Sequence, residues 1–131
     1  MTDSDRSHGE TILVVEDDLS LREMVRELLE SEGYEVLEAG DPEKAFSISR
    51  SHEGTIHLAI LDVIQPKISA RDLSDRLLEA RPGLRLLFMS GYTQESAEAS
   101  GVSPTAHFIG KPFTTAALLA KIRSVIRSPE A

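Results

Sequence analysis

The sequence contains no cysteine, which excludes a disulfide framework and any metal site built from thiolates. It has no apolar run close to the roughly 20 residues that a membrane-spanning helix needs. The first ten residues are polar and lack the apolar segment of a secretion signal. These absences predict a cytoplasmic protein without membrane insertion.

Basic residues are also scarce, since 14 Lys and Arg stand against 22 Asp and Glu and give a formal net charge of −8. Surfaces that bind nucleic acid are usually basic, so we expect no direct contact with DNA or RNA. The length of 131 residues and the apolar fraction of 40% fit one domain with an ordinary core.

Short apolar runs alternate with segments of helical periodicity along the chain, which is typical of an α/β domain with a parallel sheet. We predict five strands and five helices in residues 11–127, a disordered N-terminal segment at 1–10 and a frayed C-terminus at 128–131. The predicted strands are 12–15, 34–37, 58–61, 84–89 and about 106–109, and the predicted helices are 20–32, 42–50, 71–81, 93–100 and 115–127.

Polar residues near the expected helix starts predict the caps. Ser20 with Glu23 three residues later has the pattern of a capping box, and Asp18 either faces solvent or helps to cap the same helix. Further caps are predicted at Asp41, at Ser69 or Asp72, and at Thr114 or Thr115. Apolar helix positions such as Met24 and Phe46 are expected in the core.

Four of the predicted strands are followed by residues that suit one kind of chemistry. Glu16 and Asp17 follow the first strand, Asp62 follows the third, and Ser90 and Lys111 follow the fourth and fifth. The carboxyl ends of parallel strands share one edge of the sheet, where open α/β sheets bind ligands. Several acids, a hydroxyl and an ammonium group together suit phosphoryl chemistry on Asp62 with a magnesium ion.

Each of these motifs has an ordinary structural explanation when it stands alone. An acidic pair after a strand is usually a loop feature or a helix cap, a Ser-Gly pair is usually a turn, and Lys-Pro-Phe marks the end of a strand. Their joint placement at strand ends is what favours a functional site. Crowded carboxylates repel one another, so at least one pKa should be raised unless a cation is present.

The motifs also resemble a known family. Val15-Glu16-Asp17, Leu61-Asp62 with Pro66 four places later, Met89-Ser90-Gly91-Tyr92 and Lys111-Pro112-Phe113 occur in this order. They resemble the receiver domain of two-component response regulators, over about residues 11–127. The resemblance implies a flavodoxin-like (CheY-like) doubly wound sheet in the order 2-1-3-4-5.

The resemblance implies that Asp62 accepts a phosphoryl group from a kinase phosphohistidine, with Mg²⁺ as cofactor. Asp17 and Asp62 resemble direct metal ligands, Glu16 would act through water, and the backbone carbonyl of Ile64 would complete the protein ligands. A protein of this kind promotes only its own phosphorylation and dephosphorylation and is otherwise not an enzyme. Its partners would be a histidine kinase or a histidine phosphotransfer protein, with a possible downstream protein target.

The resemblance further implies a switch. Lys111 would pair with the phosphoryl charge, Ser90 would donate its hydroxyl to a phosphoryl oxygen, and the aromatic ring of Phe108 would turn inward. The surface of the fourth helix, fifth strand and fifth helix would report the change. One departure from the family pattern is Ala70, which replaces a usual glycine and is expected to be mildly strained if its φ is positive.

The same residues bear on three alternative functions. A flavodoxin-like redox protein is disfavoured because the acids after the first strand would repel the flavin phosphate. A haloacid-type phosphatase should have a second aspartate two residues after Asp62, where this chain has Ile64. A receiver-like interaction module that takes no phosphate remains the alternative. The sequence leaves open whether the chain acts alone, without an output domain, or comes from a hybrid kinase.

Overall fold

The computed structural model describes residues 9–63, 68–90 and 107–127. Five strands form one parallel sheet in the order β2-β1-β3-β4-β5, which confirms the predicted flavodoxin-like order. The strands are β1 (Thr11–Val15), β2 (Glu35–Ala39), β3 (Leu58–Asp62), β4 (Arg85–Ser90) and β5 (His107–Gly110). The described helices are α1 (Leu19–Ser31), α2 (Pro42–Ser51), α3 (Ala70–Ala80) and α5 (Thr115–Ile126).

The predicted elements are found where the structure describes them, with small shifts at their ends. The second strand begins at Glu35 rather than Tyr34 and extends to Ala39. The predicted helix 93–100 lies outside the described residues, as do the predicted N-terminal segment up to residue 8 and the C-terminal residues 128–131. Among the described residues, none belongs to a helix with the length and apolar character needed to cross a membrane.

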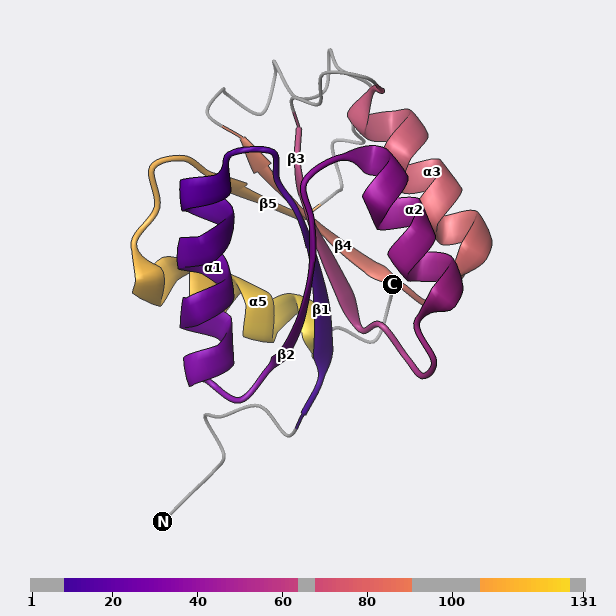
Figure 1. Ribbon diagram of the computed structural model, residues 1–131. Helices are drawn as coiled ribbons and strands as arrows, with labels where there is room; N and C mark the ends of the chain where they lie inside the picture. The colour runs from indigo at the N-terminus through magenta and orange to yellow at the C-terminus, as the bar shows by residue number, and fades with distance from the viewer. Residues whose placement is uncertain (1–8, 64–67, 91–106, 128–131) are drawn as a thin grey trace.

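The helices cover both faces of the sheet, α1 and α5 on one and α2 and α3 on the other (Figure 1). Successive residues of a strand point to opposite faces. Leu13 and Val15 of β1 accordingly pack with α2 and α3, whereas Ile12 and Val14 pack with α1 and α5. A central strand with two covered faces must be apolar throughout, and all five residues of β1 are buried.

The helix starts correct one prediction and confirm three others. Asp18, and not Ser20, is the N-cap of α1, because Asp18 has an extended backbone and accepts a hydrogen bond from the Leu21 amide, while Ser20 already lies inside the helix. The other observed caps are Asp41, Ser69 and Thr114.

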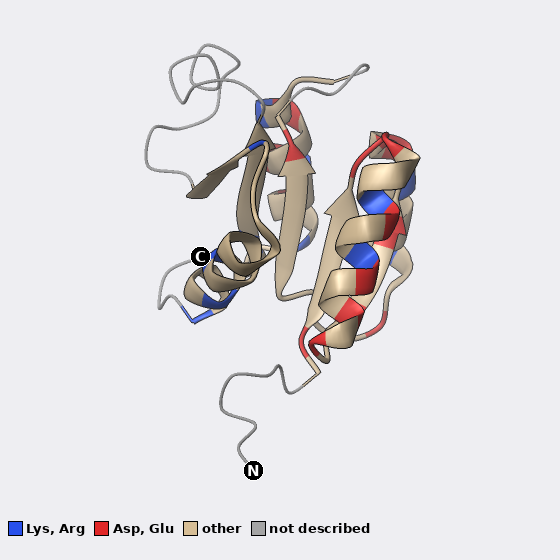
Figure 2. Cartoon of the chain, turned by 90° about the vertical axis from the view of Figure 1, so that its left-hand side faces the viewer, with Lys and Arg blue, Asp and Glu red and all other residues tan. Residues whose placement is uncertain are grey.

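Two further expectations were wrong. Ala70 has no positive φ, because Ser69 caps α3 and Ala70 occupies the first helical position. Met24 is 40% exposed rather than part of the core, because α1 fully buries only Val25 and Leu29. Figure 2 shows that the outward side of α1 instead has closely spaced acidic and basic residues.

Candidate functional site

The first acidic pair of the site directly follows β1. Glu16 is only 1% exposed, whereas Asp17 is exposed. The Glu16 amide donates to the Ala39 carbonyl at 3.0 Å, and its carboxylate accepts from the Asp18 amide at 3.0 Å. The Glu16 side chain is therefore buried and held in one orientation at the end of the central strand.

Asp62 is the last residue of β3 and is 8% exposed. The ammonium group of Lys111 lies 2.8 Å from Asp62 Oδ2 and 3.4 Å from Glu16 Oε1. The Lys111 amide donates to the Ser90 carbonyl at 2.7 Å, which fixes this lysine against the end of β4. The structure thus brings together predicted residues from the ends of four strands or the loops that follow them.

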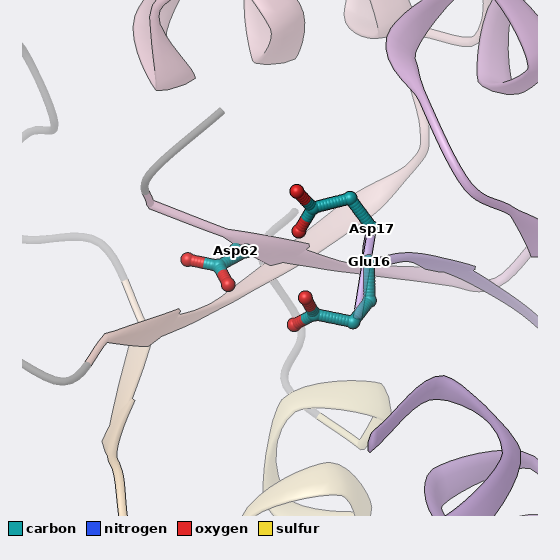
Figure 3. A group of neighbouring side chains, drawn as sticks. All are labelled: Glu16, Asp17 and Asp62. Carbon is teal, nitrogen blue, oxygen red and sulfur yellow. The ribbon is translucent and has the colours of Figure 1, made fainter. Parts of the chain in front are cut away.

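Carboxylate oxygens of Glu16, Asp17 and Asp62 lie within 4.8 Å of one another. Figure 3 shows Glu16 and Asp17 extending from the end of β1 with their carboxyl groups directed toward Asp62. Hard oxygen donors of this kind are the ligands that Mg²⁺ prefers, and it needs only one or two carboxylates from a protein. The donor set therefore fits a magnesium ion.

The electrostatics of the cluster also favour an added cation. The pKa of Glu16 is raised to about 7, first by burial and then by the negative charge of Asp62, while the hydrogen bond from the Asp18 amide and the charge of Lys111 oppose the rise. Burial lowers the pKa of Lys111, but its hydrogen bond with Asp62 and the nearby acids outweigh that effect, so the net pKa is raised. The pKa of one carboxyl group is thus raised, although burial contributes more than the expected repulsion between carboxylates.

The residues predicted for the switch lie on β4 and β5. Ser90 ends β4, is 2% exposed and pairs with Gly110 in the sheet. Phe108 pairs with Phe88, and their ring centroids are 5.8 Å apart at an interplanar angle of 35°. The inward turn of Phe108 stays a prediction. Ile64, whose carbonyl was predicted as a metal ligand, lies outside the described residues.

A second hollow, of about 320 Å³, lies between α2 and α3 and includes none of the predicted site residues. The guanidinium of Arg76 lies 4.0 Å from the centroid of the Phe46 ring there. Arginine over an aromatic ring is a common stabilising contact in its own right. We place the functional site at the acidic cluster, because charged groups from separate strands converge there.

Arg22 is a residue near the site that the sequence analysis did not single out. It lies in the first turns of α1 and donates from Nη1 to the Glu16 carbonyl at 2.9 Å. A cation near the positive end of a helix dipole is unfavourable by itself. That anomaly is the sequence signal that could have indicated a specific acceptor for Arg22.

The comparisons with known proteins agree with this geometry. Residues 12–123 match the family described as response regulator receiver domain. The response regulator GtcR of Aneurinibacillus migulanus is 31% identical over 120 residues, covering 91% of this chain and 48% of that protein. The chain thus spans about half the length of this relative.

Two solved structures extend the comparison to the fold. The receiver domain of the hybrid histidine kinase CckA is 33% identical, with a TM-score of 0.75 over 89% of this chain and 99% of that one. The response regulator TrrA of Thermotoga maritima, solved in complex with Mg²⁺-BeF, is 27% identical, with a TM-score of 0.75 over 88% of this chain and 98% of that one. The chain therefore belongs to the family of response regulator receiver domains, which act in two-component signalling.

Proposed function

We propose that this chain accepts a phosphoryl group on Asp62 from the phosphohistidine of a histidine kinase or a histidine phosphotransfer protein. The observation that supports the proposal best is the Lys111 ammonium between Asp62 and Glu16, at 2.8 and 3.4 Å, beside a third carboxylate. A nucleophilic carboxylate, a fixed cation and a set of metal ligands are the parts that phosphoryl transfer requires.

In the proposed step, an oxygen of Asp62 forms a bond to phosphorus as the phosphorus–nitrogen bond of phosphohistidine breaks. The electron pair of that bond returns to the imidazole, and the product is an acyl phosphate. Lys111 holds its ammonium against Oδ2 of Asp62 throughout, so it stabilises the negative charge of the phosphoryl group after transfer. Outside this reaction and its reversal by water, we propose no enzymatic activity.

We further propose that Asp17 and Asp62 bind Mg²⁺ directly, with Glu16 acting through water and the Ile64 carbonyl as a further ligand. The metal would supply positive charge that offsets the repulsion among phosphoryl and carboxylate oxygens. The TrrA relative was solved with Mg²⁺-BeF, and the cluster here offers carboxylate oxygens, which are donors that Mg²⁺ prefers.

The consequence of phosphorylation would pass through Ser90 and Phe108. Ser90 would donate its hydroxyl to a phosphoryl oxygen, and Phe108 would turn inward as the hydroxyl moves. The resulting shift in population changes the surface of the fourth helix, β5 and α5, which a downstream protein would read. The burial of Ser90 and the partial burial of Phe108 support this role, because both side chains lie where a small movement changes packing.

Phosphorylation with a small donor tests the proposal directly. The wild-type protein, incubated with acetyl phosphate and Mg²⁺, should gain the mass of one phosphoryl group, and EDTA should prevent the gain. Asp62→Asn should show no gain. The matched control is Asp18→Asn, which removes one charge next to the cluster but keeps an oxygen that can cap α1, and it should label like wild type.

Two results would contradict the proposal. Labelling of Asp62→Asn at the wild-type rate would place the phosphoryl group on another residue. A wild-type protein that binds Mg²⁺ but takes no phosphoryl group from acetyl phosphate or from any histidine kinase in a panel would favour the receiver-like interaction module.

A further inference from the structure

We infer that Arg22 is a positioning residue for the acidic cluster, because it fixes the peptide that joins Glu16 to Asp17. This inference rests on the proposed Mg²⁺-dependent function. Arg22 contacts the backbone that both neighbouring acids share.

The guanidinium group of Arg22 donates to a backbone carbonyl and to a carboxylate. Its Nη1 donates to the Glu16 carbonyl at 2.9 Å, and its Nε donates to Oε1 of Glu38 at 3.3 Å. Oε2 of Glu38 in turn lies 3.1 Å from Nε of Arg26. Glu38 therefore orients the guanidinium of Arg22 from β2, and Arg26 lies against the other oxygen of the same carboxylate.

The Glu16 carbonyl matters because a peptide group is planar. Its oxygen and the amide nitrogen of Asp17 belong to the same rigid unit, so fixing the oxygen fixes the direction in which the chain enters Asp17. On the other side of that unit, the Glu16 side chain accepts from the Asp18 amide. Rotation of the peptide would therefore displace both carboxylates from the cluster.

Gly40 supplies an independent observation. A Cβ atom at this position would lie 2.9 Å from Nη1 and 3.7 Å from Cζ of Arg22. The φ of Gly40 is not in the left-handed region, so the glycine serves the close approach of Arg22 and not an unusual backbone conformation. Because the obstructed atom is the end of a flexible side chain, Gly40→Ala should displace the guanidinium without unfolding the protein.

The change in Mg²⁺ affinity on mutation of Arg22 distinguishes a positioning role from a simple charge effect. The two roles predict changes in opposite directions. Removing a positive charge near a cation site should tighten Mg²⁺ binding through Coulomb interaction. Loss of positioning should weaken it, and loss of supporting contacts around metal ligands typically reduces affinity by about 10-fold or more. Isothermal titration calorimetry of the full chain with MgCl₂ measures whether the affinity rises or falls.

Three variants complete the design. Arg22→Gln should bind Mg²⁺ about 10-fold more weakly than wild type. Arg26→Gln is the control. Arg26 has the same charge as Arg22 and also contacts Glu38, but its removal leaves the hydrogen bond from Arg22 to the Glu16 carbonyl in place. The Mg²⁺ affinity of this variant should therefore equal or exceed that of wild type. Gly40→Ala changes no charge and should weaken binding in the same direction as Arg22→Gln.

A second measurement needs no metal. In EDTA, the Asp18 amide should exchange with deuterium faster in Arg22→Gln and Gly40→Ala than in wild type and Arg26→Gln, because the Glu16 carboxylate that accepts from it is displaced. An Mg²⁺ affinity of Arg22→Gln and Gly40→Ala within about twofold of wild type, or tighter, would overturn the inference. If wild type binds no Mg²⁺, the proposed function fails. The exchange rate of the Asp18 amide then tests the positioning role of Arg22 by itself.

Discussion

The two ends of the parallel sheet differ in how their buried polar groups are paired. At the carboxyl end, three carboxylates face one another and one ammonium group lies between two of them. At the amino end, the polar groups of Thr11, His57 and Arg81 meet complementary partners. The difference separates an arrangement that suits binding from one that suits stability.

The amino end is organised around Thr11, His57 and Arg81. The Thr11 amide donates to Nδ1 of His57 at 3.0 Å, so this histidine has a structural role. The guanidinium of Arg81 donates to the carbonyls of Ser49, His52 and Gly54 at 3.0, 2.7 and 2.8 Å. Arginine thereby satisfies carbonyls that the end of α2 leaves without helical partners.

At the carboxyl end, the described charges are three carboxylates and one ammonium group. The pKa of Glu16 is raised in this buried and mainly acidic environment. Functional sites commonly retain unfavourable electrostatics that a bound ligand relieves. Mutations at the amino end should therefore destabilise the fold, and at least one mutation at the carboxyl end should stabilise the metal-free protein.

The largest effect on stability is expected for Arg81→Met. Methionine keeps much of the side-chain volume but donates no hydrogen bond to the three carbonyls. We expect the free energy of unfolding to fall by about 3 kcal/mol, since hydrogen bonds to charged groups are among the stronger ones. Urea denaturation at neutral pH measures the change.

Arg71→Met is the control, because the Arg71 side chain is 70% exposed and its ion pair with Asp75 spans 3.9 Å. An exposed pair of this kind should contribute less than about 1 kcal/mol. Equal losses for the two variants would show that the carbonyl contacts of Arg81 add nothing to stability.

A smaller effect, of opposite sign, is expected for Glu16→Gln. Glutamine keeps an oxygen that can accept from the Asp18 amide but removes the buried charge. The metal-free variant should be more stable than wild type at pH 8, by on the order of 2 kcal/mol. Thermal or urea denaturation in EDTA measures the difference.

The pH dependence follows from the raised pKa. Folded Glu16 holds its proton up to about pH 7, against an ordinary pKa of 4.5, so the unfolding free energy of metal-free wild type should fall as the pH rises from about 4.5 to 7. The advantage of Glu16→Gln should disappear at pH 4.5, and Mg²⁺ should stabilise wild type more than the variant. A variant less stable than wild type at every pH would contradict this account of the carboxyl end.

The smallest effect is expected for His57→Leu. The variant leaves the buried Thr11 amide without its acceptor and should lose about 1 to 2 kcal/mol in urea denaturation. His52→Leu is the matched control, and its loss should be under about 0.5 kcal/mol because the hydrogen bonds of His52 to the described residues use its backbone and not its side chain. A loss for His57→Leu as small as that of the control would mean that water replaces the imidazole at this end.

Local sequence signals were sufficient for the parallel α/β class and for the polar residues that follow its strands, whereas the strand order was an implication of the resemblance to receiver domains. Wholly apolar runs such as Ile12–Val15 indicate a central strand, and each polar residue that follows a strand reaches the same edge. The helix start at Asp18 was assigned incorrectly to Ser20 because two capping candidates lay two residues apart. Only backbone conformation distinguishes such neighbours.

Met24 and Arg22 show a second limit. Helical periodicity placed Met24 on the apolar side of α1, but the width of the buried stripe depends on how the sheet and α5 meet that helix. Arg22 acts through a carbonyl on the preceding loop and a carboxylate on β2. The position of Arg22 at the start of α1 indicates that it has an acceptor, but the sequence does not identify the acceptor, because the partners approach only when the strands are assembled.

The sequence alone determined the class of fold and which acids, hydroxyl and ammonium could form a site, because strand and helix periods are local and strand ends in a parallel sheet converge. Tertiary structure decided how the charges are distributed within that site. Burial beside Asp62 raises the pKa of Glu16, and the same packing places Lys111 between the two acids. Those properties depend on desolvation and on distances between strands, which no single segment of the chain contains.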